Sequence, residues 1–382
     1  MSTAVPTTVV ESPQKVVEWN FLQAAQRLRL NSDLTARLQM PWREISMSVP
    51  IQKRSGEILT VECIRVLHSN ARGPALGGMQ IHLPTDEFIV GPMAFSNTLA
   101  AAVAEVPFGG AFGAFCCELS ELEQDEREQL ALGYAARMEP TLGVYRDVYA
   151  KSEGNAILNL MLGTADVDAS FGEVCGKPQE RGGLLDPRLA ENAMPVLIRR
   201  IANELDVAEP LRVVICGEDH RTKAIARVLS AAKMKVIAIG NGYTRDLLLA
   251  LNCDVLVYCG ESCSITSTHA AAVRAHLVVE ASPMAISPAA ESAMKSNGVE
   301  IVPDLLARAP EFIAAHLEWA QNMEGKQYEK ARLRETMRLR VERSCWRLLE
   351  RAQQHSLTLR EAAYEIAVEQ LGRCEMLREA AA

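Results

Sequence analysis

The sequence predicts an α/β protein of two domains, the second of which is a doubly wound, Rossmann-like domain. The chain has 382 residues, enough for two domains of ordinary size. From about residue 211, short continuous apolar runs alternate with helical or loop segments, which is typical of a parallel sheet covered on both faces. The apolar runs are Val213–Cys216, Val236–Ile239, Val255–Tyr258, Leu277–Val279 and Val299–Val302.

The N-terminal part has a different pattern of apolar residues, which predicts a mixed α/β domain. A first helix is indicated by apolar residues at helical spacing, namely Phe21, Ala24, Ala25 and Leu28. Residues 45–51 alternate between apolar and other residues, and residues 57–67 form a second extended run. The turn-forming sequence 53–56 lies between them, so we expect a β-hairpin. Helical stretches around 87–104 and 122–139 complete this domain.

These patterns divide the chain into segments, and a helical C-terminus follows the second domain. Thr358 and Glu361 form a capping-box pattern that begins a last helix. We expect a disordered tail over residues 1–15, an N-terminal α/β substrate-type and oligomerisation domain over 16–185, a Rossmann-like domain over 186–345, and C-terminal helices over 346–382 that pack back on the N-terminal domain.

Composition excludes several classes of function. The net charge of -8 and the lack of a basic cluster argue against nucleic-acid binding. No apolar run reaches the roughly 18 residues of a membrane span, and the N-terminus lacks the pattern of a signal peptide. The ten cysteines are scattered without a zinc-binding pattern, so we expect no metal and interpret them as buried thiols of a cytoplasmic protein.

Motifs along the chain resemble one family of enzymes. They are Arg65–His68, Ala71–Pro74, Gly77–Met79, Val106–Ala111, Gly176–Pro178, Val279–Glu280, Val302–Asp304, Glu318–Trp319 and Leu359–Tyr364. In this order, from about residue 20 to 378, they are similar to landmarks of the glutamate/leucine/phenylalanine/valine dehydrogenases. The resemblance implies reversible oxidative deamination of an amino acid with NAD or NADP, and a homohexamer.

The positions that the resemblance implies for catalysis carry other residues here. Leu76 and Leu99 stand where the family has lysines that hold the substrate carboxylate, and Phe112 replaces the catalytic lysine. Gln80 replaces an arginine, and Ser152 replaces an aspartate that transfers protons. Leucine and phenylalanine neither pair with a carboxylate nor carry a proton, so the family chemistry is expected to be lost.

The cofactor loop departs from the family pattern as well. In place of G-x-G-x-x-G, the chain has Gly217, Glu218, Asp219, His220, Arg221 and Thr222. Asp219 and Thr222 replace the second and third glycines, and Glu218 and Asp219 place two carboxylates where the dinucleotide phosphates would bind, although His220 and Arg221 offset part of that charge. Asn241 stands where an acidic residue usually contacts the ribose. The family's Asn-x-Gly-Gly aligns with Arg308, Pro310 and Glu311. We expect no cofactor; NAD or NADP would bind only if this loop still accepts it.

Our hypothesis is therefore a glutamate dehydrogenase-like pseudoenzyme, a scaffold or regulatory subunit. It would act in a homohexamer or in a hetero-oligomer with an active paralogue. Two alternatives stay open. One is a conventional NAD(P)-dependent amino-acid dehydrogenase whose catalytic residues the alignment misplaces; Lys151 and Glu153, beside Ser152, are the titratable candidates that could compensate in that loop. The other is a binder of small ligands in an apolar cleft between the domains, lined by Gly77, Gly78, Met79, Gln80, Phe112, Ser152 and Ala315.

Overall fold

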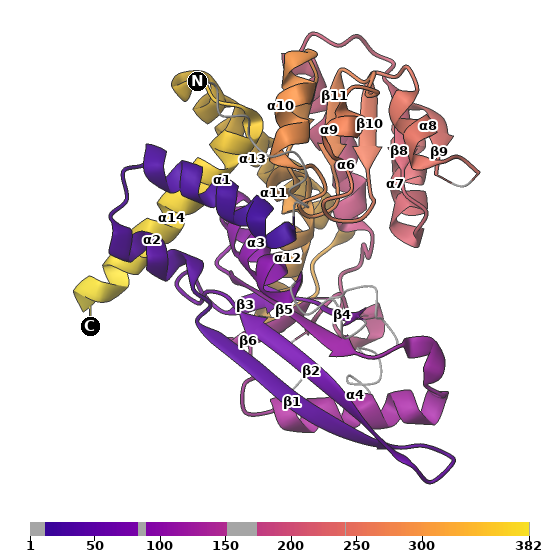
Figure 1. The fold of residues 1–382 in the computed structure, drawn as a ribbon, viewed down its shortest axis with the longest axis vertical. Coiled ribbons are helices and arrows are strands. Elements are labelled where there is room, and N and C mark those ends of the chain that lie inside the picture. Colours follow the sequence, from indigo (N-terminus) through magenta and orange to yellow (C-terminus); the bar gives the residue numbers. More distant parts are fainter. Residues whose placement is uncertain (1–11, 83–88, 151–173, 241, 382) are drawn as a thin grey trace, which may run out of the picture.

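The computed structural model describes residues 12–82, 89–150, 174–240 and 242–381. They form two lobes, each built on its own sheet (Figure 1). The first lobe comprises the described residues up to 185 and the second lobe comprises those from 186 to 345. The long C-terminal helices run back from the second lobe to the first.

The first lobe contains a seven-stranded sheet in the order β1-β2-β5-β3-β6-β7, with β4 paired to β5. The hairpin predicted over residues 45–67 is present, because β1 and β2 pair antiparallel in a register that places Ile45 opposite Arg65. The elements of this lobe are α1 (Pro13–Arg27), α2 (Ser32–Gln39), β1 (Arg43–Gln52), β2 (Ile58–Leu67), β3 (Ala75–Gly77), β4 (Met79–His82), α3 (Val90–Val103), β5 (Gly109–Cys116), α4 (Gln124–Met138), β6 (Asp147–Ala150) and β7 (Val174–Cys175).

Helices cover both faces of this sheet. Since side chains of a strand alternate between faces, Phe112 of β5 lies with Val90 and Ala94 of α3. Phe115, three positions along the same strand, lies with Tyr134 of α4 on the other face. The helix α3 is apolar over nearly its whole length and is buried almost completely.

The second lobe is the predicted doubly wound domain. Its five strands are all parallel, in the order β12-β11-β10-β8-β9, and each predicted apolar run forms one of them. The strands are β8 (Arg212–Cys216), β9 (Lys235–Ile239), β10 (Val255–Tyr258), β11 (Leu277–Glu280) and β12 (Glu300–Val302). The helices are α6 (Leu189–Glu204), α7 (His220–Ala231), α8 (Arg245–Ala250), α9 (Ser267–Ala270), α10 (Pro288–Ser296), α11 (Asp304–Ala307) and α12 (Ala309–Glu324).

Two long helices, α13 (Lys330–His355) and α14 (Leu359–Ala381), complete the chain. The capping box predicted at Thr358 and Glu361 is formed, with the Thr358 N–H donating to the Glu361 carboxylate at 2.8 Å and the Glu361 N–H donating to Thr358 Oγ1 at 3.1 Å. Figure 1 shows α14 beside α1, and Arg27 of α1 donates to Glu365 of α14 at 2.8 Å. The predicted return of the C-terminus to the first lobe is confirmed.

Two of the expected boundaries fall inside helices. The helix α1 begins at Pro13, after the N-cap Ser12, so residues 13–15 are helical rather than part of a tail; residues 1–11 lie outside the described part. The helix α13 runs without interruption through residues 345 and 346, where we placed the end of the second domain. One apolar core cluster also extends through both lobes. None of the described helices is long and apolar enough to cross a membrane.

Candidate functional site between the lobes

The substrate-side positions of the first lobe carry buried apolar side chains. Leu76 of β3 is 1% exposed, Leu99 of α3 is fully buried, and Phe112 of β5 is 5% exposed. Leu76 and Leu99 belong to the core cluster that both lobes share, whereas Phe112 packs in a separate cluster with Val66 and Val90. At all three positions, where we expect the family to carry a lysine, the side chain is packed hydrocarbon.

The glycines of these motifs are required by close backbone contacts. A Cβ atom on Gly77 would lie 1.6 Å from the carbonyl oxygen of Ala111. A Cβ atom on Gly110 would lie 2.1 Å from the backbone nitrogen of Thr98, so this glycine lets α3 pack directly on β5. These contacts explain why the shape of the motifs persists without their ionisable residues.

A buried ion pair holds the Gly77-Gly78 turn. Arg65 donates to Asp147 at 2.6 and 3.1 Å, and both side chains are inaccessible to solvent. The same guanidinium donates to the carbonyl oxygens of Gly78 at 2.7 Å and Gly77 at 3.2 Å, and it lies 4.1 Å from the ring centroid of Tyr149. The guanidinium of Arg65 is therefore paired within the fold, and its charge is not available to a ligand.

The residues expected to line an apolar cleft do not all come together. Met79 packs on the α4 side of the sheet beside Tyr134, on the face opposite Phe112, because it is opposite Gly113 in the β4–β5 register. Gln80 follows it on β4 and is partly exposed. Ala315 lies on α12, and its carbonyl oxygen accepts from the Cys175 thiol at 3.3 Å. Ser152, with Lys151 and Glu153, and Asn241 lie outside the described residues.

In the second lobe, the degenerate cofactor loop caps its own helix. Asp219 is the N-cap of α7, and its carboxylate accepts from the Thr222 N–H at 2.6 Å and from the Thr222 hydroxyl. A helix N-terminus is the place where a dinucleotide phosphate would bind. Here a carboxylate of the chain itself accepts from the Thr222 donors at this N-terminus. The neighbouring residues Glu218 and His220 are exposed to solvent.

Arg221, the cation that offset those carboxylates in the sequence, has internal partners. It forms an ion pair with Glu311 of α12 and donates to the carbonyl oxygen of Ala281 at 2.9 Å. A small pocket beside this pair is lined by Glu191, Met194, Ile225 and Pro310, among others. The lining includes the carboxylates of Glu191 and Glu311 and the guanidinium of Arg221, so the net charge of the pocket is negative. A negative charge disfavours the binding of a phosphate.

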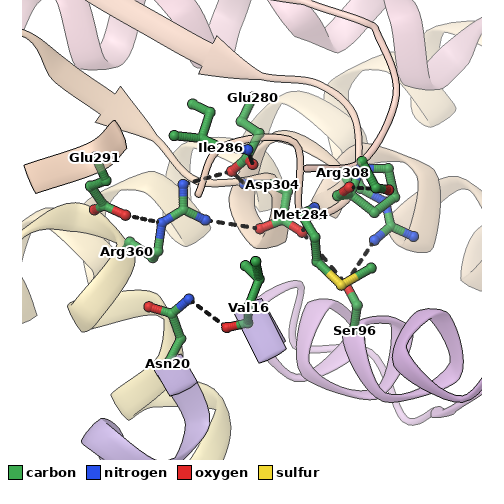
Figure 2. A network of polar contacts seen from close by, with 12 residues as sticks. Val16, Asn20, Ser96, Glu280, Met284, Ile286, Glu291, Asp304, Arg308 and Arg360 are labelled. Carbon is green, nitrogen blue, oxygen red and sulfur yellow. Dashed lines mark hydrogen bonds and ion pairs between the residues drawn. The ribbon is translucent and has the colours of Figure 1, made fainter. Parts of the chain in front are cut away.

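A buried charge network lies between α14 and the sheet of the second lobe (Figure 2). Arg360 of α14, 2% exposed, pairs with Glu280 at 2.8 Å, with Asp304 at 3.5 Å and with Glu291. The Glu280 carboxylate also accepts from the backbone N–H groups of Ile286 and Asp304, at 2.7 and 3.1 Å. Burial nevertheless raises the pKa of Glu280 from its usual 4.5 to about 7, against the opposing effect of Arg360.

Arg308 extends this network into the first lobe. Its side chain donates to Ser96 Oγ at 3.1 Å and to Asn97 Oδ1, both on α3, and the residue is 6% exposed. The Ser96 hydroxyl also faces Asp304 Oδ2 at 3.5 Å, as Figure 2 shows. Asn97 in turn donates to the carbonyl oxygen of Ala111, next to Phe112, at 2.8 Å.

Sequence reasoning did not find these contacts. Arg308 was noted only as a replacement for a family asparagine, and its partners on α3 lie more than 200 residues earlier in the chain. The one available signal was a charged residue inside an otherwise apolar stretch, since such a residue needs polar partners when it is buried. Within the described residues, no group of three or more potential ligands is arranged for a metal ion.

Comparison with known proteins agrees with this architecture. Residues 41–164 match the family described as Glu/Leu/Phe/Val dehydrogenase, dimerisation domain, and residues 199–378 match Glutamate/Leucine/Phenylalanine/Valine dehydrogenase. The chain is 25% identical to the NAD-specific glutamate dehydrogenase of Staphylococcus aureus, and the alignment covers 97% of this chain and 98% of that protein.

Solved structures give the same result. The hetero-hexameric glutamate dehydrogenase of Thermus thermophilus, in a Leu-bound form, is similar with a TM-score of 0.88 and 25% identity, covering 96% of this chain and 98% of that one. The glutamate dehydrogenase of Peptoniphilus asaccharolyticus shares the fold, with a TM-score of 0.82, 22% identity, and coverage of 96% and 99%. The chain therefore belongs to the glutamate/leucine/phenylalanine/valine dehydrogenase family and is a glutamate dehydrogenase-like member of it.

Proposed function

We propose that this protein is a non-catalytic subunit of a glutamate dehydrogenase-type assembly and acts through its contacts with other subunits. The observation that carries the proposal is that both halves of the expected site are occupied by the chain's own side chains. Substrate-side positions are buried apolar residues, and the phosphate position is taken by a carboxylate.

The chemical nature of the side chains at the expected substrate positions supports this proposal. An amino-acid carboxylate needs a cation in a desolvated pocket, and deamination needs a group that exchanges protons near neutral pH. Leu76, Leu99 and Phe112 supply neither. The buried cation Arg65, which contacts the Gly77-Gly78 turn, is already paired with Asp147.

The cofactor side supports it by electrostatics. A dinucleotide pyrophosphate would have to displace the Asp219 carboxylate from the α7 N-terminus. It would also approach the exposed Glu218 and the carboxylate of Glu311, which pairs with Arg221. Repulsion between like charges and the loss of the helix cap both oppose binding.

Assembly is favoured by the free edge of the first-lobe sheet. The strand β1 is terminal in the strand order, so in the described structure its outer side pairs with no other strand. An unpaired edge strand offers backbone donors and acceptors to a second chain. The match to the dimerisation domain includes this strand, and the similar Thermus thermophilus protein is hetero-hexameric. We propose a homohexamer or a hetero-oligomer with an active paralogue.

Co-expression with the glutamate dehydrogenase of the same cell, followed by affinity purification and native mass measurement, tests the assembly. The expected result is a hetero-oligomer, or a homo-oligomer of this chain alone. The purified chain is expected to show no turnover of glutamate, leucine or phenylalanine with either nicotinamide cofactor. Turnover that disappears on changing Ser152 or Lys151 would contradict the proposal and favour a working dehydrogenase.

A second candidate function is the binding of a small regulatory ligand, because the similar Thermus thermophilus structure is a Leu-bound form. Thermal-shift measurements with leucine, other apolar metabolites, NAD and NADP separate the possibilities. Stabilisation by leucine alone would favour a regulatory ligand site. Stabilisation by NAD or NADP would favour a retained cofactor site.

A further inference from the structure

The helix α12 is fastened to both lobes along its length. Just before its first turn, Arg308 donates to Ser96 and Asn97 of α3 in the first lobe. In its first turn, Glu311 pairs with Arg221 of α7 in the second lobe. The beginning of the helix is therefore held from two sides by charged hydrogen bonds.

The middle of α12 is bound to the turn after β7. The buried Glu318 carboxylate accepts from the backbone N–H groups of Gly176 at 2.9 Å and Lys177 at 3.1 Å, and the Lys177 ammonium lies 3.7 Å from it. Glu318 and Lys177 are 3% and 6% exposed. Breaking this contact would leave a charge without its partner in the protein interior, which is costly.

The later turns add neutral contacts to the first lobe. The Trp319 indole N–H donates to the carbonyl oxygen of Val144 at 3.0 Å, and the Gln321 amide donates to that of Gly182 at 2.9 Å. The Trp319 ring also meets Phe108 edge-on, with the centroids 5.6 Å apart. Below these polar contacts, a single apolar core cluster continues from one lobe into the other.

We propose that α12 fixes the two lobes in one relative orientation, so that this subunit does not open and close. We call this rigid connection between the lobes the splint. Enzymes with a site between two lobes commonly depend on hinge closure around the ligand. Here, Arg308 and Glu311 stand where the family resemblance predicts an asparagine and a glycine; Arg308 connects α12 to α3 of the first lobe, and Glu311 fixes the start of α12 to Arg221 within the second lobe.

Such a subunit would present fixed surfaces to its neighbours in an assembly. The splint is a property of the single chain and does not depend on the proposed function, so its test uses no activity measurement. If the chain proved to be an active dehydrogenase, measuring the motion of the lobes would still test this proposal.

The test measures the distance between the lobes by single-molecule energy transfer in the full-length protein. Dyes are attached through non-canonical residues at Leu132 of α4 and Leu247 of α8, which are 46% and 50% exposed. We expect one narrow distance distribution for the unmodified sequence. Arg308→Asn removes the tie to α3, and we expect it to broaden that distribution or add a second, more widely separated population.

Arg200→Asn is the matched control, because Arg200 pairs with Glu204 on the surface of α6 within one lobe. We expect it to leave the distance distribution unchanged. Two distance populations in the unmodified protein would overturn the proposal. A distance distribution for Arg308→Asn as narrow as that of the unmodified protein would also overturn it. If Arg308→Asn does not fold, Ser96→Ala, which removes one acceptor, decides the question: broadening supports the splint, and no change overturns it.

Discussion

The first-lobe positions and the second-lobe loop that we propose have lost the family's function differ in how their side chains are accommodated. In the first lobe, Leu76, Leu99 and Phe112 are buried and apolar. In the second lobe, Asp219 and Arg221 keep their charges and satisfy them within the chain. Apolar replacements add to the core and so contribute to stability, whereas paired charges at a partly exposed loop contribute little.

The largest effect is expected from returning a lysine to the first lobe. Phe112→Lys places an ammonium group in the apolar cluster of Val66, Val90 and Ala94. We expect unfolding to become easier by about 3 kcal/mol or more, because the charge must be desolvated or neutralised. Urea unfolding measures this cost. Leu132→Lys, at a half-exposed position of α4, is the control and should be nearly neutral. A well-tolerated Phe112→Lys would mean that this site is not a packed core.

A cavity in the shared core is the next largest change. Leu99→Ala removes a fully buried side chain from the cluster that joins the lobes, and we expect a loss of about 2–5 kcal/mol. Calorimetric or denaturant unfolding would report it. Leu339→Ala, at an α13 position that is 51% exposed, should cost much less. Equal costs at the two positions would remove the distinction between core and surface on which the comparison depends.

The buried charges of the second lobe should make stability depend on pH. The pKa of Glu280 rises from 4.5 to about 7 on burial, so the folded chain holds this proton more tightly than the unfolded chain. The contribution of Glu280 to stability is therefore largest below pH 4.5 and falls as the pH rises to about 7. Glu280→Gln cannot titrate, and the difference between its stability–pH curve and that of the parent should follow this window. Parallel curves would show that Glu280 does not titrate there.

The smallest effect is expected at the cofactor loop. Asp219→Ala removes the N-cap of α7, and we expect a loss of about 0.5–2 kcal/mol. Asp219→Asn keeps an oxygen acceptor for the Thr222 N–H and should retain most of the stability. Thermal unfolding of the two variants measures the difference. If Asp219→Ala cost more than Leu99→Ala, the cofactor loop would be the more important structural element, and the comparison of the two lobes would be reversed.

Local patterns predicted most of the secondary structure. The apolar runs predict the strands β8 to β12, because strands buried on both faces are continuously apolar. The β1–β2 hairpin is predicted by the alternation of residues 45–51, the extended run 57–67 and the turn-forming residues between them. The start of α14 was identified by its capping box. Patterns of this kind could not place the end of the second domain, because α13 continues across it as one helix.

The candidate site was predictable in chemistry but not in arrangement. The sequence alone determined that Leu76, Leu99 and Phe112 are apolar and that Glu218 and Asp219 follow Gly217, since residue identity needs no structure. Only the tertiary structure decided that Met79 and Phe112 face opposite sides of the sheet, because that depends on strand register. It also decided that Arg308 reaches Ser96 and Asn97, because contacts between residues this far apart in the chain arise only when the lobes pack together.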